Sequence, residues 1–237
     1  MTPQCNPVLH YTKKPLLPHN NQVVVISSAA SKKLQKNERK KRKDTIKCVI
    51  VGDKQVGKTS LAVSYSNDSF PNEYVPTGYD IYKVDVLVDD EPVGLEICDT
   101  AGEELGASLR RLCYPGTDVI MLCFSVVRPN SFESACKRWA EELTRLGAPV
   151  VLVGCQSDLL NDLDVLGNLH RQHQGPVTRA RAQELAHRLN ATYVVTSAKT
   201  CNNLKEAFDE AITAVLKKRK QQRRRKWLKL CCSKGET

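Results

Sequence analysis

The 237-residue sequence has no apolar run approaching the roughly 18–20 residues that a membrane-spanning helix needs, so it predicts no such helix. Its ten cysteines show no paired spacing of the kind that binds a metal, and no signal peptide is recognisable. We therefore expect reduced thiols in a cytosolic protein. Cysteine is also missing from the last four residues, 234–237, so the prenylation pattern is absent.

Charge is spread unevenly along the chain. The formal net charge is +10, with +8 in residues 1–44 and +9 in residues 217–237, which leaves −7 for residues 45–216. The length suits one α/β domain with tails. We predict a disordered basic extension over 1–44, a folded domain over 45–216 and a polybasic tail over 217–237.

The N-terminal extension contains several prolines, two of them in a pattern typical of peptide ligands. Pro15-Leu16-Leu17-Pro18 has the spacing of a polyproline ligand. Nothing else in the segment supports a docking motif, so an irregular tail is the preferred interpretation.

A phosphate-binding pattern begins the folded part. It consists of Gly52, Asp53, Lys54, Gln55, Val56, Gly57, Lys58 and Thr59. The apolar run 46–51 precedes it and a helix starts at Ser60, which is the context that the pattern requires. Backbone N–H groups of such a loop converge on phosphate oxygens, Lys58 reaches the terminal phosphates, and Thr59 offers a hydroxyl to Mg²⁺. The alternative is a turn that happens to hold two glycines, which these flanking elements disfavour.

Strands and helices alternate through the rest of the domain. Residues 81–88 alternate in polarity and pair with 93–98 through a turn, and apolar runs at 119–124, 149–154 and 192–195 predict buried strands. Helices are expected from Asn130 or Ser131 to Leu146, over 178–189 and over 204–216. This alternation predicts a parallel-dominated sheet with helices on both faces.

Polar residues follow several of these strands. Asp99 can hold Mg²⁺ through water, and the Gly102 amide can touch a terminal phosphate. Asp158, after another strand, can accept two N–H donors from guanine, a pair that adenine lacks. Ser197-Ala198-Lys199 can offer a backbone N–H to the guanine carbonyl. Each of these motifs alone is more simply interpreted as an ordinary polar loop. Together with the phosphate loop they make four motifs in this order at one edge of the sheet, which predicts a guanine-nucleotide site.

With these motifs in order, residues 45–216 resemble the Ras superfamily of small GTPases. Tyr74-Val75-Pro76-Thr77 and the segment 161–175, similar to an insert helix, are typical of the Rho family. Gln156-Ser157-Asp158 and the tail residues 227–232 resemble its atypical Wrch/Chp branch. The resemblance implies a P-loop NTPase fold, with a six-stranded, mostly parallel sheet, helices on both faces and a Rho-type insert.

The same resemblance implies a GTP/GDP switch that acts on the cytoskeleton and cell morphology. Thr77 would close onto Mg²⁺ and the γ-phosphate, which makes Thr59, Thr77 and Asp99 the metal site, and Phe70 would cover the guanine. Residues 70–80 and 99–113 would be the mobile loops that bind effector proteins. Exchange factors are further expected partners, and the protein is expected to be a monomer.

Two substitutions depart from the family pattern at the catalytic geometry. Lys54 replaces a glycine and crowds the space of the attacking water and of a partner's arginine finger. Glu103 replaces a glutamine; an ionised carboxylate can only accept a hydrogen bond and brings negative charge beside the γ-phosphate. We expect weak hydrolysis and a poor response to activating proteins. Lys54 and Glu103 can pair across the phosphate, although exposure of each to solvent is the preferred interpretation.

The base-recognition segment also departs from the pattern. Cys155 and Gln156 replace the usual Asn or Thr followed by Lys. Because a shorter, neutral Gln156 should pack less well beside the phosphate loop, we expect fast nucleotide exchange. Fast exchange with slow hydrolysis predicts a mostly GTP-bound switch. The alternative is a binding module that never hydrolyses GTP.

The C-terminal tail combines a basic run over 217–229 with Trp227 and the pair Cys231-Cys232. Basic residues and Trp suit an anionic membrane surface, and the paired cysteines suggest palmitoylation, as in the Wrch/Chp branch. We expect the cytoplasmic face of the plasma membrane or endomembranes, with a cytosolic pool. A nucleic-acid patch is the alternative for any such run, and we expect no nucleic-acid binding.

Overall fold

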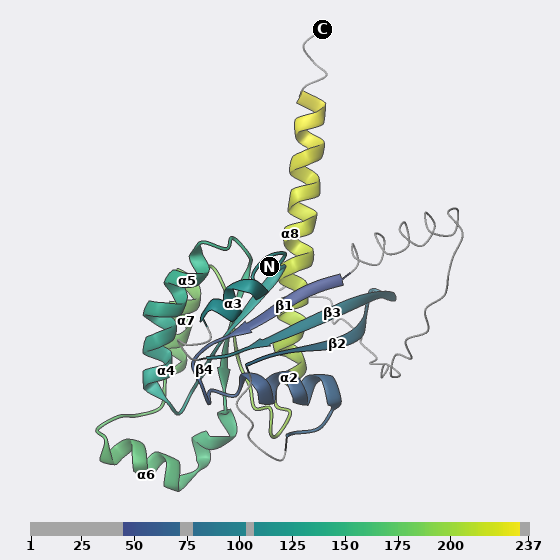
Figure 1. The fold of residues 1–237 in the computed structure, drawn as a ribbon. Helices are drawn as coiled ribbons and strands as arrows, with labels where there is room; N and C mark the ends of the chain where they lie inside the picture. The colour runs from purple at the N-terminus through teal and green to yellow at the C-terminus, as the bar shows by residue number, and fades with distance from the viewer. Residues whose placement is uncertain (1–44, 72–77, 103–106, 233–237) are drawn as a thin grey trace, which may run out of the picture.

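The computed structural model describes residues 45–71, 78–102 and 107–232. The predictions for residues 1–44, Thr77 and Glu103 therefore fall outside the described residues. A six-stranded sheet forms the centre of the domain, in the order β2-β3-β1-β4-β5-β6 (Figure 1). Its strands are β1 (Thr45–Val51), β2 (Tyr79–Val88), β3 (Glu91–Thr100), β4 (Val119–Ser125), β5 (Val150–Cys155) and β6 (Thr192–Val195).

The sheet is parallel apart from the β2–β3 hairpin. β4 and β5 are buried along their whole length because helices cover both faces of the sheet, and their sequences are accordingly almost wholly apolar. β2 lies at the edge, so only every second residue of Val84–Val88 is buried. The predicted fold class is confirmed.

Helices form a layer on each face (Figure 1). They are α2 (Lys58–Asn67), α3 (Ala107–Cys113), α4 (Pro129–Ser134), α5 (Ala140–Thr144), α6 (Leu163–Arg171), α7 (Arg179–Arg188) and α8 (Leu204–Cys232). The core beneath α2 and α8 contains Tyr65 stacked on Phe208, with ring centroids 3.8 Å apart. The core on the other face contains Trp139 and Leu185.

The helix predicted to end at Leu146 contains a π-helical turn, η1 (Ala135–Trp139), between α4 and α5. The segment 161–175, expected to hold an insert helix, contains α6 and begins at the last residue of a 3-10 turn, η2 (Ser157–Asn161). Asp162 caps α6 by accepting hydrogen bonds from the backbone N–H groups of Asp164 and Val165.

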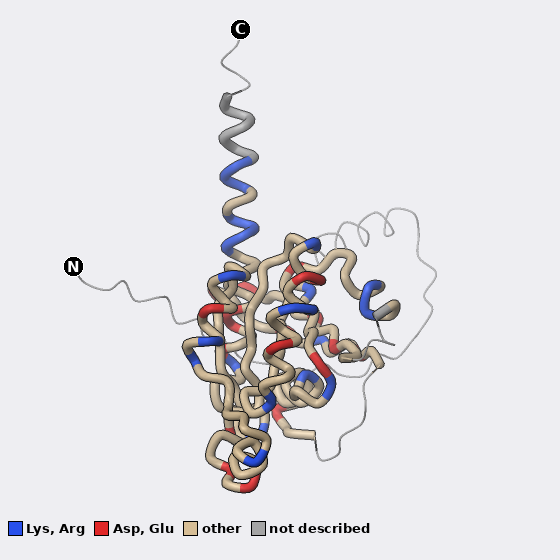
Figure 2. The backbone as a smooth tube through the Cα atoms, turned by 90° about the vertical axis from the view of Figure 1, so that its left-hand side faces the viewer, with Lys and Arg blue, Asp and Glu red and all other residues tan. Residues whose placement is uncertain are grey.

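The prediction that the last helix ends at residue 216 is wrong, because α8 continues to Cys232. Lysine, arginine and glutamine are good helix formers, so the basic run propagates the helix. Lys and Arg follow one another along the part of α8 that leaves the domain (Figure 2). Within the described residues, none of the helices is both long and apolar enough to traverse a membrane.

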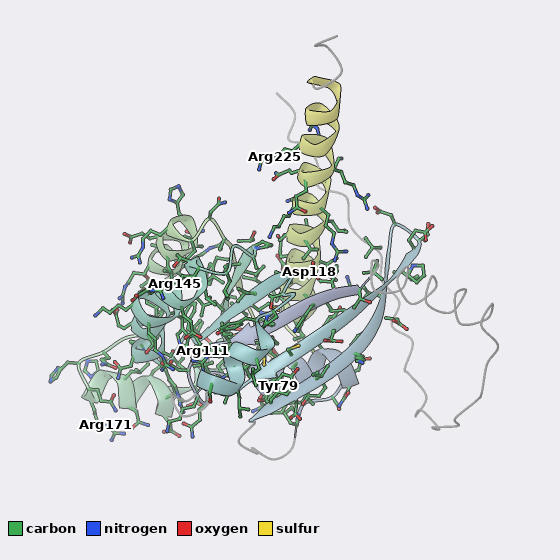
Figure 3. The ribbon with its side chains drawn as sticks, turned by 45° about the horizontal axis from the view of Figure 1, so that its top comes forward. Tyr79, Arg111, Asp118, Arg145, Arg171 and Arg225 are labelled. Carbon is green, nitrogen blue, oxygen red and sulfur yellow. The ribbon has the colours of Figure 1, made fainter. Side chains whose placement is uncertain are left out.

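The base of this extension is fixed to the domain. Arg219 donates to the Thr45 carbonyl at 2.9 Å and to the Asp118 carboxylate at 3.0 Å. Asp118, labelled in Figure 3, also accepts from the backbone N–H of Lys47 at 3.0 Å. The first basic residues of the predicted tail therefore contact the domain itself.

Candidate functional site

The phosphate loop connects β1 to α2 and depends on two glycines. At Gly52, φ is +143°, and a Cβ atom would lie 2.1 Å from the Cys123 carbonyl oxygen of β4. At Gly57, φ is +103°, a conformation that favours glycine. The next turn closes with a hydrogen bond from the Leu61 N–H to the Gly57 carbonyl at 2.9 Å. Because glycine allows both features, the loop winds tightly against the sheet, with Val56 buried in the core.

Lys58, the first residue of α2, folds back over this loop. Its Nζ donates to the Asp53 carbonyl at 2.7 Å. Burial lowers the pKa of the Lys58 ammonium below its usual value, and the Asp99 carboxylate acts against this shift. A buried cation at a loop of this type, beside a helix N-terminus, suits an anion with several negative oxygens.

The side chains of Thr59 and Asp99 meet beside Lys58. The Thr59 hydroxyl donates to the Asp99 carboxylate at 2.6 Å, although the two residues are 40 positions apart. Asp99 is fully buried at the carboxyl end of β3. A hydroxyl and a carboxylate are oxygen ligands of the type that Mg²⁺ prefers, so these two residues fit the predicted metal. Thr77, the third predicted ligand, lies outside the described residues.

The loop after β3 lies directly against the phosphate loop. A Cβ atom on Gly102 would be 2.4 Å from the Lys54 nitrogen and 2.5 Å from the Asp53 carbonyl carbon. Only glycine permits this approach, which brings Gly102 and Lys54 to the same edge of the site.

A pocket of about 230 Å³ lies beside the phosphate loop. Seven of its lining residues were predicted to contact the nucleotide: Gly57 and Ser60 from the phosphate-loop segment, with Phe70, Gln156, Asp158, Ala198 and Lys199. Four further lining residues were not predicted to contact it: Leu61, Cys155, Leu159 and Thr196. Asp158 Oδ1 accepts from the Ser197 hydroxyl at 2.6 Å, and the Ser197 oxygen accepts from the Thr200 N–H at 3.1 Å. These bonds orient the Asp158 carboxylate, which can accept the two adjacent N–H donors that guanine offers.

Gln156, which we expect to pack less well beside the phosphate loop than the usual lysine, makes one hydrogen bond to it. Its amide Nε2 donates to the Gln55 carbonyl at 3.2 Å. Arg128 donates to the Gln55 side chain at 2.9 Å. Gln55 has φ of +60°, so two neighbouring loops hold a residue in a left-handed conformation. Fast exchange stays a prediction.

Two residues beside the site were missed by the sequence analysis. The Trp139 indole N–H donates to the Asp53 carboxylate at 2.8 Å. Arg110 is 1 % exposed, lies 4.6 Å from the Trp139 ring and donates to the Ala101 carbonyl and to Glu142. A buried tryptophan usually finds a partner for its N–H, which is the one signal that could have pointed to Trp139.

Fold and site together define a guanine-nucleotide-binding protein of the P-loop class. The model of the Ras family matches residues 47–217. The chain is 49 % identical over 175 residues to the Rho-related GTP-binding protein RhoV of rat, mouse and human, a match that covers 72 % of this chain and 74 % of each relative. The chain therefore belongs to the Ras family, as a small GTPase of the Rho type.

Proposed function

We propose that this Rho-type GTPase is a signalling switch with slow turnover, which stays mostly loaded with GTP. The observation that carries the proposal is how closely Gly102 approaches Lys54: a Cβ atom on Gly102 would lie 2.4 Å from the Lys54 backbone nitrogen. A long cationic side chain at this point leaves little room at the γ-phosphate edge. An attacking water and a partner's arginine need that same space, and an arginine finger is worth about 10³–10⁵ in rate.

The residues that would bind the nucleotide are those that the structure brings together in the site. Lys58 and the loop N–H groups would bind the phosphates, and Asp158 with Ser197, Ala198 and Lys199 would bind the guanine. Thr59 and Asp99 would hold Mg²⁺, which neutralises charge on the phosphate oxygens. Glu103, outside the described residues, adds negative charge in the second mobile loop, and this also slows hydrolysis.

Single-turnover hydrolysis of bound GTP tests the proposal. We expect the unmodified chain to be slow, Lys54→Gly and Glu103→Gln each to be faster, and the double variant to be fastest. Equal GTP uptake by all four proteins is the control. A wild-type rate equal to that of a conventional family member would remove the proposal.

The same four proteins test the Lys54–Glu103 pairing. Their GTP affinities form a double-mutant cycle, and a coupling energy of zero excludes a contact between the two side chains. Phosphate release followed over hours separates a slow switch from the alternative, a binding module that never hydrolyses GTP.

Exposed apolar side chains support effector binding through residues 70–80 and 99–113. Among the described residues, the large apolar side chains classed as exposed are Phe70, Tyr79, Ile81, Leu109, Leu112 and Leu163. Five of these six lie in or next to the two loops, and Leu112 is 76 % exposed. Such clustering marks a surface that binds proteins. Binding of effectors to the GTP form but not to the GDP form would support this assignment.

We infer in addition that the C-terminal part of α8 attaches the protein to an anionic membrane. Cations follow one another along this helix, and Cys231 and Cys232 end it. One acyl chain with a basic run, or two chains, anchors a protein stably. Cys231→Ser with Cys232→Ser should remove hydroxylamine-sensitive acylation and shift the protein to the soluble fraction. Tail-dependent DNA binding with unchanged fractionation would favour the nucleic-acid alternative.

A further inference from the structure

A second and larger cavity, of about 920 Å³, lies beside the nucleotide site. One wall is the phosphate loop at Asp53 and Lys54, with Gly102 next to it. A second wall is the start of α4 and the η1 turn, and the third is the α6 segment with Gln172 and Gln174. The cavity is therefore a cleft between the phosphate loop and the insert helix.

The cleft is cationic. Lys54, Arg128 and Arg138 line it, and among the described lining residues Asp53 alone is acidic. The Asp53 carboxylate already accepts the Trp139 N–H. Among the described lining residues, cations therefore outnumber carboxylates, and Arg128 and Arg138 are the cations that a ligand would meet.

Both arginines are held by neutral groups. Arg128 Nη1 donates to the Gln55 amide oxygen at 2.9 Å, and Arg138 Cζ lies 4.8 Å from the centre of the Trp139 ring. Across the part of the chain that the structure describes, neither guanidinium forms an ion pair with a carboxylate. Arg138 is near enough to Glu142 to lower the pKa of that carboxyl, but the Glu142 carboxylate is hydrogen-bonded to Arg110 and Tyr114. Two positioned guanidinium groups with no directly bonded carboxylate can recognise one, since Arg pairs with carboxylates in bidentate geometry.

The opposite wall supplies a different chemistry. Asn168, Gln172 and Gln174 present amides, while Val165 and Leu169 present apolar surface. Amides suit the backbone N–H and C=O groups of a peptide, and the apolar residues suit intervening aliphatic side chains. This mixture fits an extended peptide better than a compact inorganic anion.

We propose that this cleft binds an acidic segment of a partner protein, with its carboxylates on Arg128 and Arg138. A partner bound there would contact the phosphate loop at Asp53 and Lys54 and would lie next to the base pocket, because Gln156 and Leu159 line both cavities. Arg128 and Arg138 also repel an incoming arginine, so the cleft selects acidic partners over basic ones. The inference rests on the proposed function only in requiring a nucleotide-loaded fold; it does not depend on slow turnover.

A labelled six-residue peptide of glutamate and leucine tests the proposal. Its affinity for the full chain loaded with GDP and Mg²⁺ is measured by fluorescence anisotropy. The same peptide with glutamine in place of glutamate is the ligand control. Arg128→Gln with Arg138→Gln is the test variant. Arg111→Gln with Arg145→Gln, which removes the same charge from the positions labelled in Figure 3, is the matched control.

We expect saturable binding of the glutamate peptide, weakened at least about tenfold in the test variant and less than about twofold in the control variant. Equal weakening in the two variants, equal affinity for the glutamine peptide, or no saturable binding would overturn the proposal. So would arginine-dependent binding of anionic vesicles without binding of the peptide. GDP uptake by each variant is measured separately, so a failure of nucleotide binding is distinguished from a failure of the cleft.

Discussion

The Trp139 indole N–H donates to the Asp53 carboxylate at 2.8 Å, which joins the helical layer to the phosphate loop. Arg110 lies against the same ring and donates to the Ala101 carbonyl, just before Gly102. One buried tryptophan therefore connects the phosphate loop with the start of the loop that follows β3. The π-helical turn that ends at Trp139 belongs to this connection.

Replacing Trp139 with Phe keeps an aromatic ring and removes the N–H donor. The Asp53 carboxylate then loses a hydrogen bond, which for a charged group is worth about 1.5–3 kcal/mol. We expect labelled GDP to be released about tenfold faster. In urea unfolding, the midpoint concentration should fall while the dependence of the unfolding free energy on urea concentration changes little. Unchanged release from a folded Trp139→Phe protein would show that this bond does not hold the phosphate loop.

Glu142 makes the stability of this network depend on pH. It accepts from Arg110 at 3.1 and 3.2 Å and from the Tyr114 hydroxyl at 2.5 Å. Burial alone would raise the pKa of Glu142, but the hydrogen bonds from Arg110 and Tyr114 outweigh it, so the pKa lies below the usual 4.5. A carboxyl with a depressed folded-state pKa stabilises the protein above its unfolded pKa and loses that contribution as the pH falls through the folded value.

We therefore expect Glu142→Gln to be less stable than the wild type by about 3 kcal/mol at pH 7, because buried Arg110 loses its charged partner. This difference should shrink as the pH falls below 4.5. Urea unfolding of both proteins between pH 3 and pH 7 measures it. A difference that is constant over this range would mean that the Glu142 charge contributes nothing.

Two glycine substitutions form a matched pair. An alanine at Gly102 would bring Cβ within 2.4 Å of the Lys54 nitrogen, so the backbone at residue 102 must move away from the phosphate loop. We expect GTP binding to weaken at least about tenfold by this loss of orientation. In α6, Gly167 has no atom within 4 Å of a Cβ, and Gly167→Ala should stabilise the protein by up to about 1 kcal/mol. Similar nucleotide affinities for the two variants would contradict the close packing at Gly102.

Arg219 tests whether the start of the basic helix belongs to the domain. Arg219→Gln removes the bonds to the Thr45 carbonyl and Asp118 and should cost about 1 kcal/mol of unfolding free energy. Lys220→Gln removes the same charge from an exposed neighbour and should leave stability unchanged. Hydrogen exchange should also quicken in α8 beyond residue 216 in the Arg219 variant alone. Equal effects of the two substitutions would show that the Arg219 hydrogen bonds do not fix the start of the basic helix to the domain.

Hydrophobic periodicity predicted the sheet because β4 and β5 are apolar on both faces. The order of the motifs predicted the phosphate loop because few residues other than glycine can adopt its backbone conformation. Contacts between distant loops were not predictable in this way. Gln55 and Arg128 are 73 positions apart, and Asp53 and Trp139 are 86 apart, so no local pattern joins them. The end of α8 was missed because its basic composition was interpreted as a tail, although those residues favour a helix.

The α3 helix was missed for a different reason. It is a single short segment of seven residues, Ala107–Cys113, in a loop whose sequence shows no clear period. Its anchor is Arg110, a charged residue that local sequence reasoning assigns to the surface but that the fold buries against Trp139 and Glu142.

The most direct test measures nucleotide uptake by the purified full chain, with and without Mg²⁺. Labelled GTP and labelled ATP are compared for the wild type and for Asp158→Ala. The account predicts Mg²⁺-dependent uptake of GTP with no comparable uptake of ATP, and a large loss of GTP affinity in the Asp158→Ala protein. Equal uptake of ATP and GTP would contradict the account. So would GTP uptake that is unchanged both when Mg²⁺ is removed and in the Asp158→Ala protein.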